Sequence, residues 1–323
     1  MKDSPLYYSI GALLYCPANN KSIAGSIINN RFGSRFSLAL CLEDTINDNF
    51  VLQAEQILFS SLQKIRHALS ETSFYLPKIF IRIRNKEQMQ RLYSMSGELS
   101  SLITGFIIPK FSLENADDFI QTILEINETA RRPVYMMPIY ESPSIIDLRK
   151  RYDILYGLKE KLDSIRELIL NIRVGGNDLC HVFGYRRHAD ESIHKIPPIA
   201  QIFSDINTVY GLDYVISGPV WEYFNGPNWE QGLRNEISED ILCGFTGKTV
   251  IHPRQIPIVN ESYSITAADF ESAKAILNWK KETPSFVSSD PGKERMNEYK
   301  THTNWARKIL FLADCYGIRQ EKP

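Results

Sequence analysis

The chain has 323 residues, of which 43% are hydrophobic and 23% are charged, and its formal net charge is −1 at pH 7. These values are typical of a globular protein with one large domain or two ordinary ones. The lack of a basic excess argues against nucleic acid or a membrane surface as a partner, and no apolar stretch reaches the roughly 18 residues of a membrane span. Five widely scattered cysteines indicate reduced thiols in a cytoplasmic protein.

Short apolar runs recur along the chain, and most are nearly continuous, as expected of parallel strands that are covered on both faces. The first run is short and lies in a segment interrupted by Tyr, Ser and Gly, which favours a strand over a signal peptide. Eight strands are predicted, at residues 12–17, 37–44, 78–85, 102–110, 133–141, 168–178, 212–219 and 246–253.

Longer amphipathic patterns fill most of the intervals between these runs and predict helices. The helix expected to open at Ser112 has acids in its first turn, which suits the helix dipole. Strands that alternate with helices predict an α/β fold, a (β/α)₈ TIM barrel, with an open doubly wound sheet as the main competitor. Clear helical patterns cover residues 51–69, 112–130, 144–162 and 266–281.

The C-terminal part departs from this alternation. Residues 281–295 are rich in Pro, Ser and charge and predict a linker or loop. Residues 296–318 predict a terminal helix that caps the barrel or reaches a neighbouring subunit. We therefore expect residues 1–265 to form the barrel and residues 266–323 to supply its last helix, the linker and a C-terminal helical extension.

Acidic residues end two successive predicted strands, at Glu141 and Asp178. Chemistry in this fold collects at the carboxyl ends of strands, and neighbouring strands lie about 4.8 Å apart. The two carboxylates can therefore share one ion, and Mg²⁺ prefers one or two carboxylates completed by water and substrate oxygens. No His or Cys stands with them, which disfavours zinc. Alternatively, Glu141 caps a helix that starts near Ser144, and Asp178 caps a loop.

Two arginines, Arg82 and Arg84, end the third strand and lie two residues apart, so that both are expected on one face. If that face is the barrel interior, their guanidinium groups can bind a carboxylate or a phosphate bidentately. Alternatively, they pair with Glu43 and Asp44 on the adjacent strand, and both roles are compatible.

Gly175 and Gly176 form a second candidate site for substrate binding, because glycines let the main chain approach a ligand closely. Asn177 beside them and Pro219 at the end of the seventh strand complete this set.

Three further patterns are weaker. The segment "GFTGKTVIHP" contains GxxGK but lacks the spacing of a phosphate-binding loop. His252 within it is interpreted mainly as a structural histidine. The pair Arg186 and Arg187 follows the Asp178 loop, where it is a candidate for binding an anionic substrate group.

Several segments, in order, resemble motifs of the citrate lyase β-subunit and HpcH/HpaI aldolase superfamily. "ALCLEDTI" is similar to its "DLEDxV", "IFIRIRN" to its "VRIN", "GFIIPK" to its "xxxPK" and "PIYES" to its "xIET". "IRVGGNDLCHVFG" resembles "xxxGxxDLxxxxG". The most specific segment, "GFTGKTVIHPRQIPIVNESY", resembles "GFxGKxxIHPxQIxxxNxxF". These matches run from about residue 13 to residue 263.

The resemblance implies a TIM barrel, usually oligomeric, that binds Mg²⁺ through Glu141 and Asp178. It implies that Arg82 binds the carboxylate or acyl carbonyl of the substrate, with Glu43 and Asp44 as a supporting acidic pair. The implied reaction is reversible C–C cleavage of a small β-hydroxy acid, often as a coenzyme A thioester, through a metal-stabilised enolate. The expected partners are therefore a small carboxylate or acyl-CoA substrate and further copies of the chain.

Some positions differ from the family pattern. Cys41 replaces the first Asp of "DLED", and Arg84 replaces the Asn of "VRIN". These features resemble a branch associated with bacterial tellurium-resistance and stress gene clusters. Three alternatives to a lyase remain: a Mg²⁺-dependent synthase or thioesterase, a non-catalytic ligand-binding member, and a phosphosugar enzyme using Arg84, Arg186 and Arg187. The hydroxyl proton has three candidate acceptors, namely metal-bound water, Asp44 and a residue of a neighbouring subunit.

Overall fold

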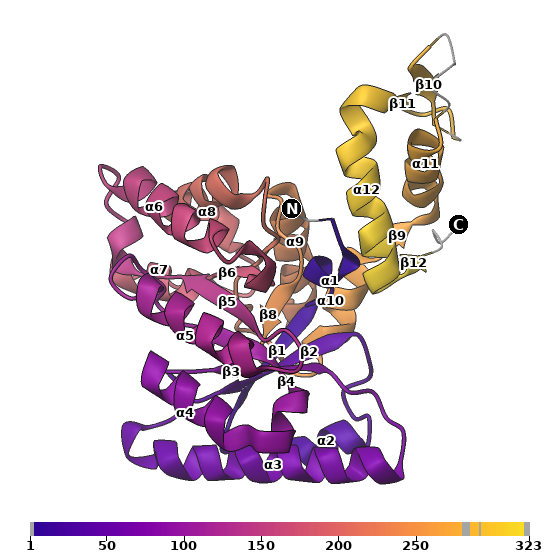
Figure 1. The fold of residues 1–323 in the computed structure, drawn as a ribbon. Helices are drawn as coiled ribbons and strands as arrows, with labels where there is room; N and C mark the ends of the chain where they lie inside the picture. The colour runs from indigo at the N-terminus through magenta and orange to yellow at the C-terminus, as the bar shows by residue number, and fades with distance from the viewer. Residues whose placement is uncertain (1–2, 280–284, 291, 320–323) are drawn as a thin grey trace.

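Eight parallel strands form the centre of the protein (Figure 1). The structure is a computed structural model that describes residues 3–279, 285–290 and 292–319. The strands follow the order β7-β6-β5-β4-β3-β2-β1-β8, and a bridge between Gly218 and Lys248 joins the two outer strands. The sheet is therefore nearly closed, and the predicted TIM barrel is confirmed. The strands are β1 Ala12–Pro17, β2 Phe36–Cys41, β3 Lys78–Arg82, β4 Ile103–Ile108, β5 Tyr135–Tyr140, β6 Ile172–Val174, β7 Ile216–Ser217 and β8 Lys248–Val250.

Every predicted run overlaps one of these strands; β2 begins one residue before its run, and several strands end earlier than predicted. Strand β3 ends at Arg82, so Arg84 lies beyond it. Strand β6 ends at Val174, so the segment 175–178 passes directly into a helix. These early ends move polar residues from the sheet into the loops at its carboxyl end.

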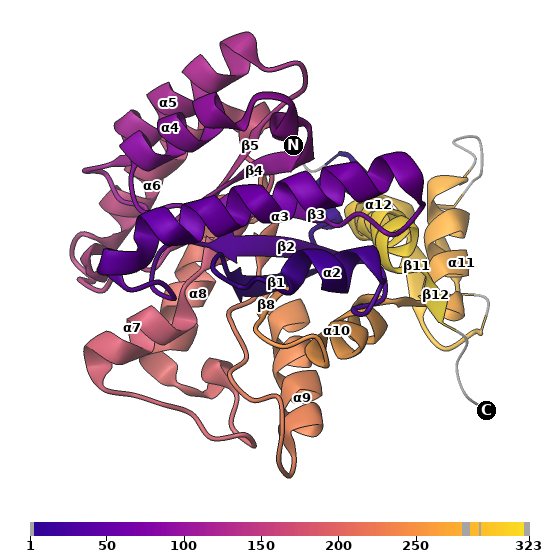
Figure 2. The same cartoon turned by 90° about the horizontal axis from the view of Figure 1, so that it is seen from below.

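Helices follow the strands and cover the outside of the barrel; Figure 2 shows α2 and α3 over β1 and β2. The helix predicted from Ser112 begins only at Ala116, because the Asn115 side chain accepts the Ser112 N–H and holds a short turn there. The helices are α1 Pro5–Tyr8, α2 Ile23–Ile28, α3 Val51–Glu71, α4 Lys86–Ser96, α5 Ala116–Thr129, α6 Arg151–Asp163, α7 Gly176–Phe183, α8 Pro197–Tyr210, α9 Trp229–Leu242, α10 Gln255–Tyr263, α11 Ala267–Leu277 and α12 Tyr299–Tyr316.

Buried apolar side chains form two separate clusters. The larger cluster lies between the strands and the surrounding helices. The smaller cluster contains Leu13, Phe80, Ile107 and Met137 and fills the barrel interior. Strand residues alternate between the two sides, so the next inward positions towards the carboxyl end are free to carry polar groups.

The C-terminal extension is an antiparallel pair of helices, α11 and α12, which lies to one side of the barrel in Figure 1. Two short strands, β9 Ile265–Thr266 and β12 Ile318–Arg319, pair at its base, and β10 Val287–Ser289 pairs with β11 Met296–Glu298 at the other end. The predicted linker includes residues 281–284 and 291, which lie outside the described residues. Within the described ranges, no helix is both long enough and apolar enough to cross a bilayer.

Candidate active site

A cavity of about 230 Å³ opens at the carboxyl ends of the barrel strands. Six of the predicted site residues line it: Arg82, Glu141, Gly175, Gly176, Asn177 and Asp178. The parallel strands explain this convergence, because all of their carboxyl ends meet at one end of the barrel. The other predicted site residues, which are Glu43, Asp44, Arg84 and Pro219, are not part of its lining.

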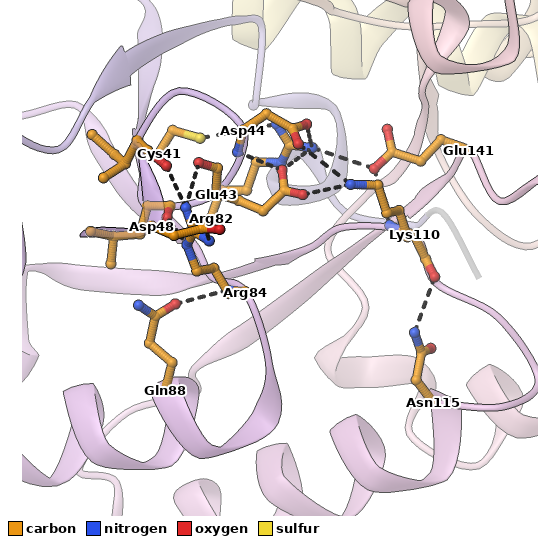
Figure 3. A network of polar contacts seen from close by, with 12 residues as sticks. Cys41, Glu43, Asp44, Asp48, Arg82, Arg84, Gln88, Lys110, Asn115 and Glu141 are labelled. Atoms are coloured by element: carbon orange, nitrogen blue, oxygen red, sulfur yellow. Dashed lines mark hydrogen bonds and ion pairs between the residues drawn. The ribbon is translucent and has the colours of Figure 1, made fainter. Parts of the chain in front are cut away.

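Arg82 is the centre of an ionic cluster, shown in Figure 3. Its guanidinium lies 2.7 Å from Glu43, 2.9 Å from Asp44 and 3.4 Å from Glu141. Burial by itself would lower the pKa of Arg82, but Tyr15 and the nearby acids raise it above its ordinary value. The arginine is therefore permanently charged and held in one position, with its face towards the cavity.

Lys110 links the acids of this cluster. Its ammonium group lies 2.7 Å from Glu43 and 3.4 Å from Asp44, and its backbone N–H donates to Glu141 at 3.0 Å. Its φ of 49° places it in the left-handed region, and Asn115 supports this conformation by donating to its carbonyl at 3.0 Å. A strained backbone thus orients one oxygen of Glu141.

Glu141 and Asp178 face the same cavity. Glu141 is only 3% exposed; burial raises its pKa to about 8, Arg82 opposes this shift, and the charge of Asp178 adds to it. Asp178 lies in the first turn of α7, where the helix dipole favours a negative charge. The alternative that Glu141 caps the helix near Ser144 is wrong, because the Ser142 side chain caps the short helix Pro143–Ile145.

Comparison with known proteins assigns the chain to a family. The family model for C–C bond lyases of the TIM-barrel fold matches residues 4–318. The chain belongs to this C–C bond lyase family. A curated relative, the (3S)-malyl-CoA thioesterase of Cereibacter sphaeroides (strain ATCC 17025 / ATH 2.4.3), is 44% identical over 50 residues. That match spans 16% of this chain and 18% of the relative.

Solved structures share the fold of this chain at low sequence identity. A citrate lyase from Burkholderia xenovorans LB400 has a TM-score of 0.71 and 14% identity, covering 97% of this chain and 94% of the other. CitE from Mycobacterium tuberculosis, solved in complex with magnesium, acetoacetate and coenzyme A, has a TM-score of 0.61 and 17% identity. That match covers 96% of this chain and 100% of CitE. These likenesses confirm the barrel fold.

The carboxylates of this cavity fit a hard divalent cation. Glu141 carries a raised pKa beside a second carboxyl group, so one more positive charge in the cavity would stabilise both ionised acids. Among the described residues, no three or more His, Cys, Asp or Glu side chains are grouped to hold a metal. Two carboxylates with open positions match Mg²⁺, which retains several waters and accepts substrate oxygens.

The two glycines of the cavity wall lie close to neighbouring side chains. A Cβ atom on Gly175 would lie 2.2 Å from Oε2 of Glu141. A Cβ atom on Gly176 would lie 2.9 Å from Cβ of Pro219, which is buried beneath it. The absence of side chains at 175 and 176 therefore leaves room for Glu141 and for the start of α7.

Gly175→Ala is expected to displace the Glu141 carboxylate and to weaken Mg²⁺ binding by about 10- to 100-fold, the usual effect of disturbing a group that orients a ligand. Calorimetric titration with Mg²⁺ measures this change. Gly25→Ala on α2 is the matched control, because a Cβ atom there meets nothing within 4 Å. Wild-type Mg²⁺ affinity in Gly175→Ala would contradict the assignment of Glu141.

The other predicted arginines are engaged outside the cavity. Arg84 donates to the carbonyl of Leu42 at 2.6 Å and pairs with Asp48 at 2.5 Å, so it fastens the loop that carries Glu43 and Asp44. Arg187 is buried and pairs with Glu236 at 3.0 Å. Arg186, whose side chain is 80% exposed, lies 3.5 Å from Glu222. These three arginines do not converge on a common anion site.

The most specific sequence segment is largely structural. Lys248 is fully buried and pairs with Glu236 at 3.0 Å and Asp240 at 2.7 Å, which explains why its GxxGK pattern is not a phosphate loop. His252 stacks on Phe224 at 4.7 Å, and its Nδ1 accepts the backbone N–H of Arg254.

Sequence reasoning missed three polar residues that line the cavity. Tyr15, Arg173 and Thr249 point inward from β1, β6 and β8. The available signal was a charged or polar residue inside an apolar strand, most clearly Arg173 in "LILNIRVGG". The prediction considered only the ends of the strands and therefore passed over them.

Proposed function

We propose that the protein is a Mg²⁺-dependent lyase that cleaves a C–C bond of a small β-hydroxy acid, either free or as its coenzyme A thioester. One observation carries this proposal: Glu141 and Asp178 line a small cavity together with the charged side chain of Arg82. Mg²⁺ held by Glu141 and Asp178 would supply Lewis-acid chemistry at this point. The (3S)-malyl-CoA thioesterase and the CitE complex with magnesium, acetoacetate and coenzyme A support the substrate class.

Arg82 has a defined task in this reaction. The bond between the α and β carbons breaks, its electron pair stays on the α carbon as an enolate, and the β carbon becomes a carbonyl. A guanidinium fixed by three carboxylates offers a preorganised positive charge for the enolate oxygen. Glu43, Asp44 and Lys110 hold that arginine in position.

A base must take the proton of the β-hydroxyl group. Asp44 is a candidate, because its side chain is 48% exposed and lies against Arg82. Burial acts to raise the pKa of Asp44, but Glu43, Arg82 and Lys110 together lower it, so Asp44 is ionised at neutral pH. Water at the site and a residue of a neighbouring subunit are the alternatives.

The size of the cavity limits what enters it. Typical small-molecule sites occupy about 300–1,000 Å³, whereas this cavity measures about 230 Å³. A small acid, or the acyl end of a thioester, fits such a volume, and a coenzyme A moiety would remain outside. Thioester hydrolysis is a second candidate function, favoured by the local match to the malyl-CoA thioesterase.

A product assay separates these functions. The protein with Mg²⁺ is incubated with β-hydroxy acids, free and as coenzyme A thioesters, among them malate and malyl-CoA. Cleavage releases a carbonyl product that phenylhydrazine detects, whereas hydrolysis releases a free thiol that a thiol reagent detects. We expect the carbonyl product, and its formation should stop when a chelator is added.

Two outcomes would redirect the proposal. Thiol release without a carbonyl product assigns the site to hydrolysis. Formation of β-hydroxy acyl product from acetyl-CoA and glyoxylate, with no detectable cleavage, assigns it to synthesis.

A further inference from the structure

A second cavity, of about 330 Å³, lies between the barrel and the C-terminal helical extension. Figures 1 and 2 show α10 at this junction, beside α12. The second cavity is at the amino end of β8, because Thr246, which lines it, precedes that strand, whereas Thr249 within the strand lines the candidate active site. Among the described residues, none lines both cavities. Its volume falls in the range of about 300–1,000 Å³ that is usual for small-molecule sites.

Aromatic and aliphatic side chains form much of the wall of the second cavity. On the barrel side, Phe245 and Tyr263 are buried beneath it. On the other side, one face of α12 lines the cavity, because its residues recur at spacings of three and four. These residues are Trp305, Lys308, Ile309 and Leu312. Such a wall suits the apolar body of a ligand.

Lys308 is the charged residue on this face of α12. Its side chain is half-buried, and burial lowers the pKa of its amine. In the part of the chain that the structure describes, no carboxylate lies within 4.0 Å of its nitrogen, and the nitrogen makes no hydrogen bond. The hydroxyl group of Thr246, a residue only 3% exposed, likewise lacks a hydrogen-bond partner among the described residues. Two unused donors therefore line the cavity.

Positive charge exceeds negative charge in the lining of the second cavity. Asp269 is the one acid among the described lining residues, and it already pairs with Arg295 at 2.5 Å. Arg319 also lines the cavity; it is exposed and donates to the carbonyl of Glu261 at 3.3 Å. The charge of Lys308 is therefore left without a counter-ion inside the cavity.

The other lysines of the described ranges differ from Lys308. Each pairs with an acid or is exposed, except Lys78, which is half-buried and lies outside the second cavity. The Cys315 thiol acts to raise the pKa of Lys78, against the lowering by burial. A half-buried ammonium group without a partner contributes little to folding, because it has lost hydration and gains no ion pair. An anionic ligand would supply the partner that Lys308 lacks.

We infer that the second cavity binds a small organic monocarboxylate, whose carboxylate pairs with Lys308 and whose hydrocarbon part lies against Phe245, Tyr263 and Trp305. One ammonium group matches a single negative charge. A phosphate dianion would lose its hydration against the apolar wall without a second buried cation. This site is separate from the candidate active site and does not depend on the proposed reaction.

Two ligands with the same hydrocarbon body test the inference. 4-Phenylbutyrate and 4-phenyl-1-butanol both carry a phenyl group on a four-carbon chain, but only 4-phenylbutyrate ends in a carboxylate. Their binding to the full chain is measured by calorimetry without Mg²⁺, so that no metal contributes. We expect a dissociation constant of about 1 mM or below for the acid. A hydrogen bond to a charged group predicts that the acid binds about 10- to 100-fold more tightly than the alcohol.

Substitutions of two lysines assign this preference. Lys308→Met, which removes the charge and retains an apolar side chain, should reduce the preference for the acid to within about 2-fold. Lys78→Met is the matched control, because Lys78 is also half-buried without an acid but does not line the cavity, and it should leave the preference unchanged.

Folding is checked by the thermal unfolding of each variant without ligand. Lys308→Met should unfold at the same temperature as the wild type or higher, because it removes a half-buried charge that has no partner. Should it fail to fold, Lys308→Gln, which keeps a polar side chain without the charge, decides the question by the same loss of preference.

Trp305 reports where the acid binds, because its ring lines the cavity. Binding of 4-phenylbutyrate should change the tryptophan fluorescence of the wild type. Trp305→Phe should remove this change while calorimetry still detects binding, because phenylalanine retains an aromatic wall. A fluorescence change that persists in Trp305→Phe would place the acid elsewhere and overturn the inference.

Four further results would overturn the inference: no detectable binding of 4-phenylbutyrate, equal binding of the acid and the alcohol by the wild type, an unchanged preference in Lys308→Met, or Lys308-dependent binding of inorganic phosphate that is tighter than that of 4-phenylbutyrate. The last result would assign the cavity to a phosphate group. A failure of C–C cleavage in the product assay would refute the proposed lyase and leave this carboxylate site in place.

Discussion

Replacing Glu141 and Asp178 together by alanine is expected to abolish Mg²⁺ binding and to lower the proposed C–C lyase activity by at least about 10³-fold. A Lewis acid supplies several kcal/mol of transition-state stabilisation, and about 1.4 kcal/mol corresponds to a factor of ten in rate. Glu141 and Asp178 are the two carboxylates that line the cavity. Calorimetric titration with Mg²⁺ and the product assay measure the two effects separately.

The fold should survive this double substitution. Arg82 retains Glu43 and Asp44 as partners after Glu141 is removed, so no buried charge is left alone. A variant with two other carboxylates removed, Asp117→Ala with Asp118→Ala, is the control, since both lie on the exposed face of α5. Retained Mg²⁺ affinity in the Glu141 and Asp178 variant would refute both the metal site and the lyase proposal.

Lys248→Met is expected to destabilise the protein by about 3–5 kcal/mol, because breaking a buried ionic network leaves charges in the interior without a partner. Lys248, Glu236 and Asp240 are all fully buried. The Lys248 ammonium lies 3.0 Å from Glu236 and 2.7 Å from Asp240. Urea denaturation followed by circular dichroism gives the change in the free energy of unfolding.

Two further variants define the cause of this loss. Lys161→Met removes a surface lysine that pairs with Asp117 and should cost less than about 1 kcal/mol. Lys248→Met combined with Asp240→Asn should be more stable than Lys248→Met alone, because the substitution at position 240 neutralises the acid that loses its partner. His194, which lies 2.7 Å from Asp240, still offers a hydrogen bond to that side chain. If Lys248→Met unfolds at the same urea concentration as the wild type, the network does not stabilise the barrel.

Much of the fold could be predicted because continuous apolar runs mark buried parallel strands, and each of the eight runs overlaps a strand. The candidate site could be predicted where acids and bases end those runs, as at Arg82 and Glu141. Arg84 was harder to place, because β3 ends two residues before it and its side chain turns to the loop around Leu42.

Other features depended on tertiary contacts that a linear pattern does not contain. Lys248 contacts Glu236 and Asp240 only when α9 packs against the sheet. In sequence, these two acids are four residues apart and cannot be told from a pair on an exposed helix face. Arg173 lies between Ile172 and Val174, which belong to the outer apolar cluster, so its place on the cavity wall depends on the closure of the barrel.

The two ends of the described chain are in direct contact. Tyr316 donates to the carbonyl of Tyr8 at 2.9 Å, Cys315 donates to the carbonyl of Pro5 at 3.2 Å, and β1 pairs with β8. During synthesis on the ribosome, the first strand therefore emerges long before its second neighbour exists. Contacts of such large sequence separation slow folding, so the first strand is expected to lack its second neighbour until β8 has been synthesised.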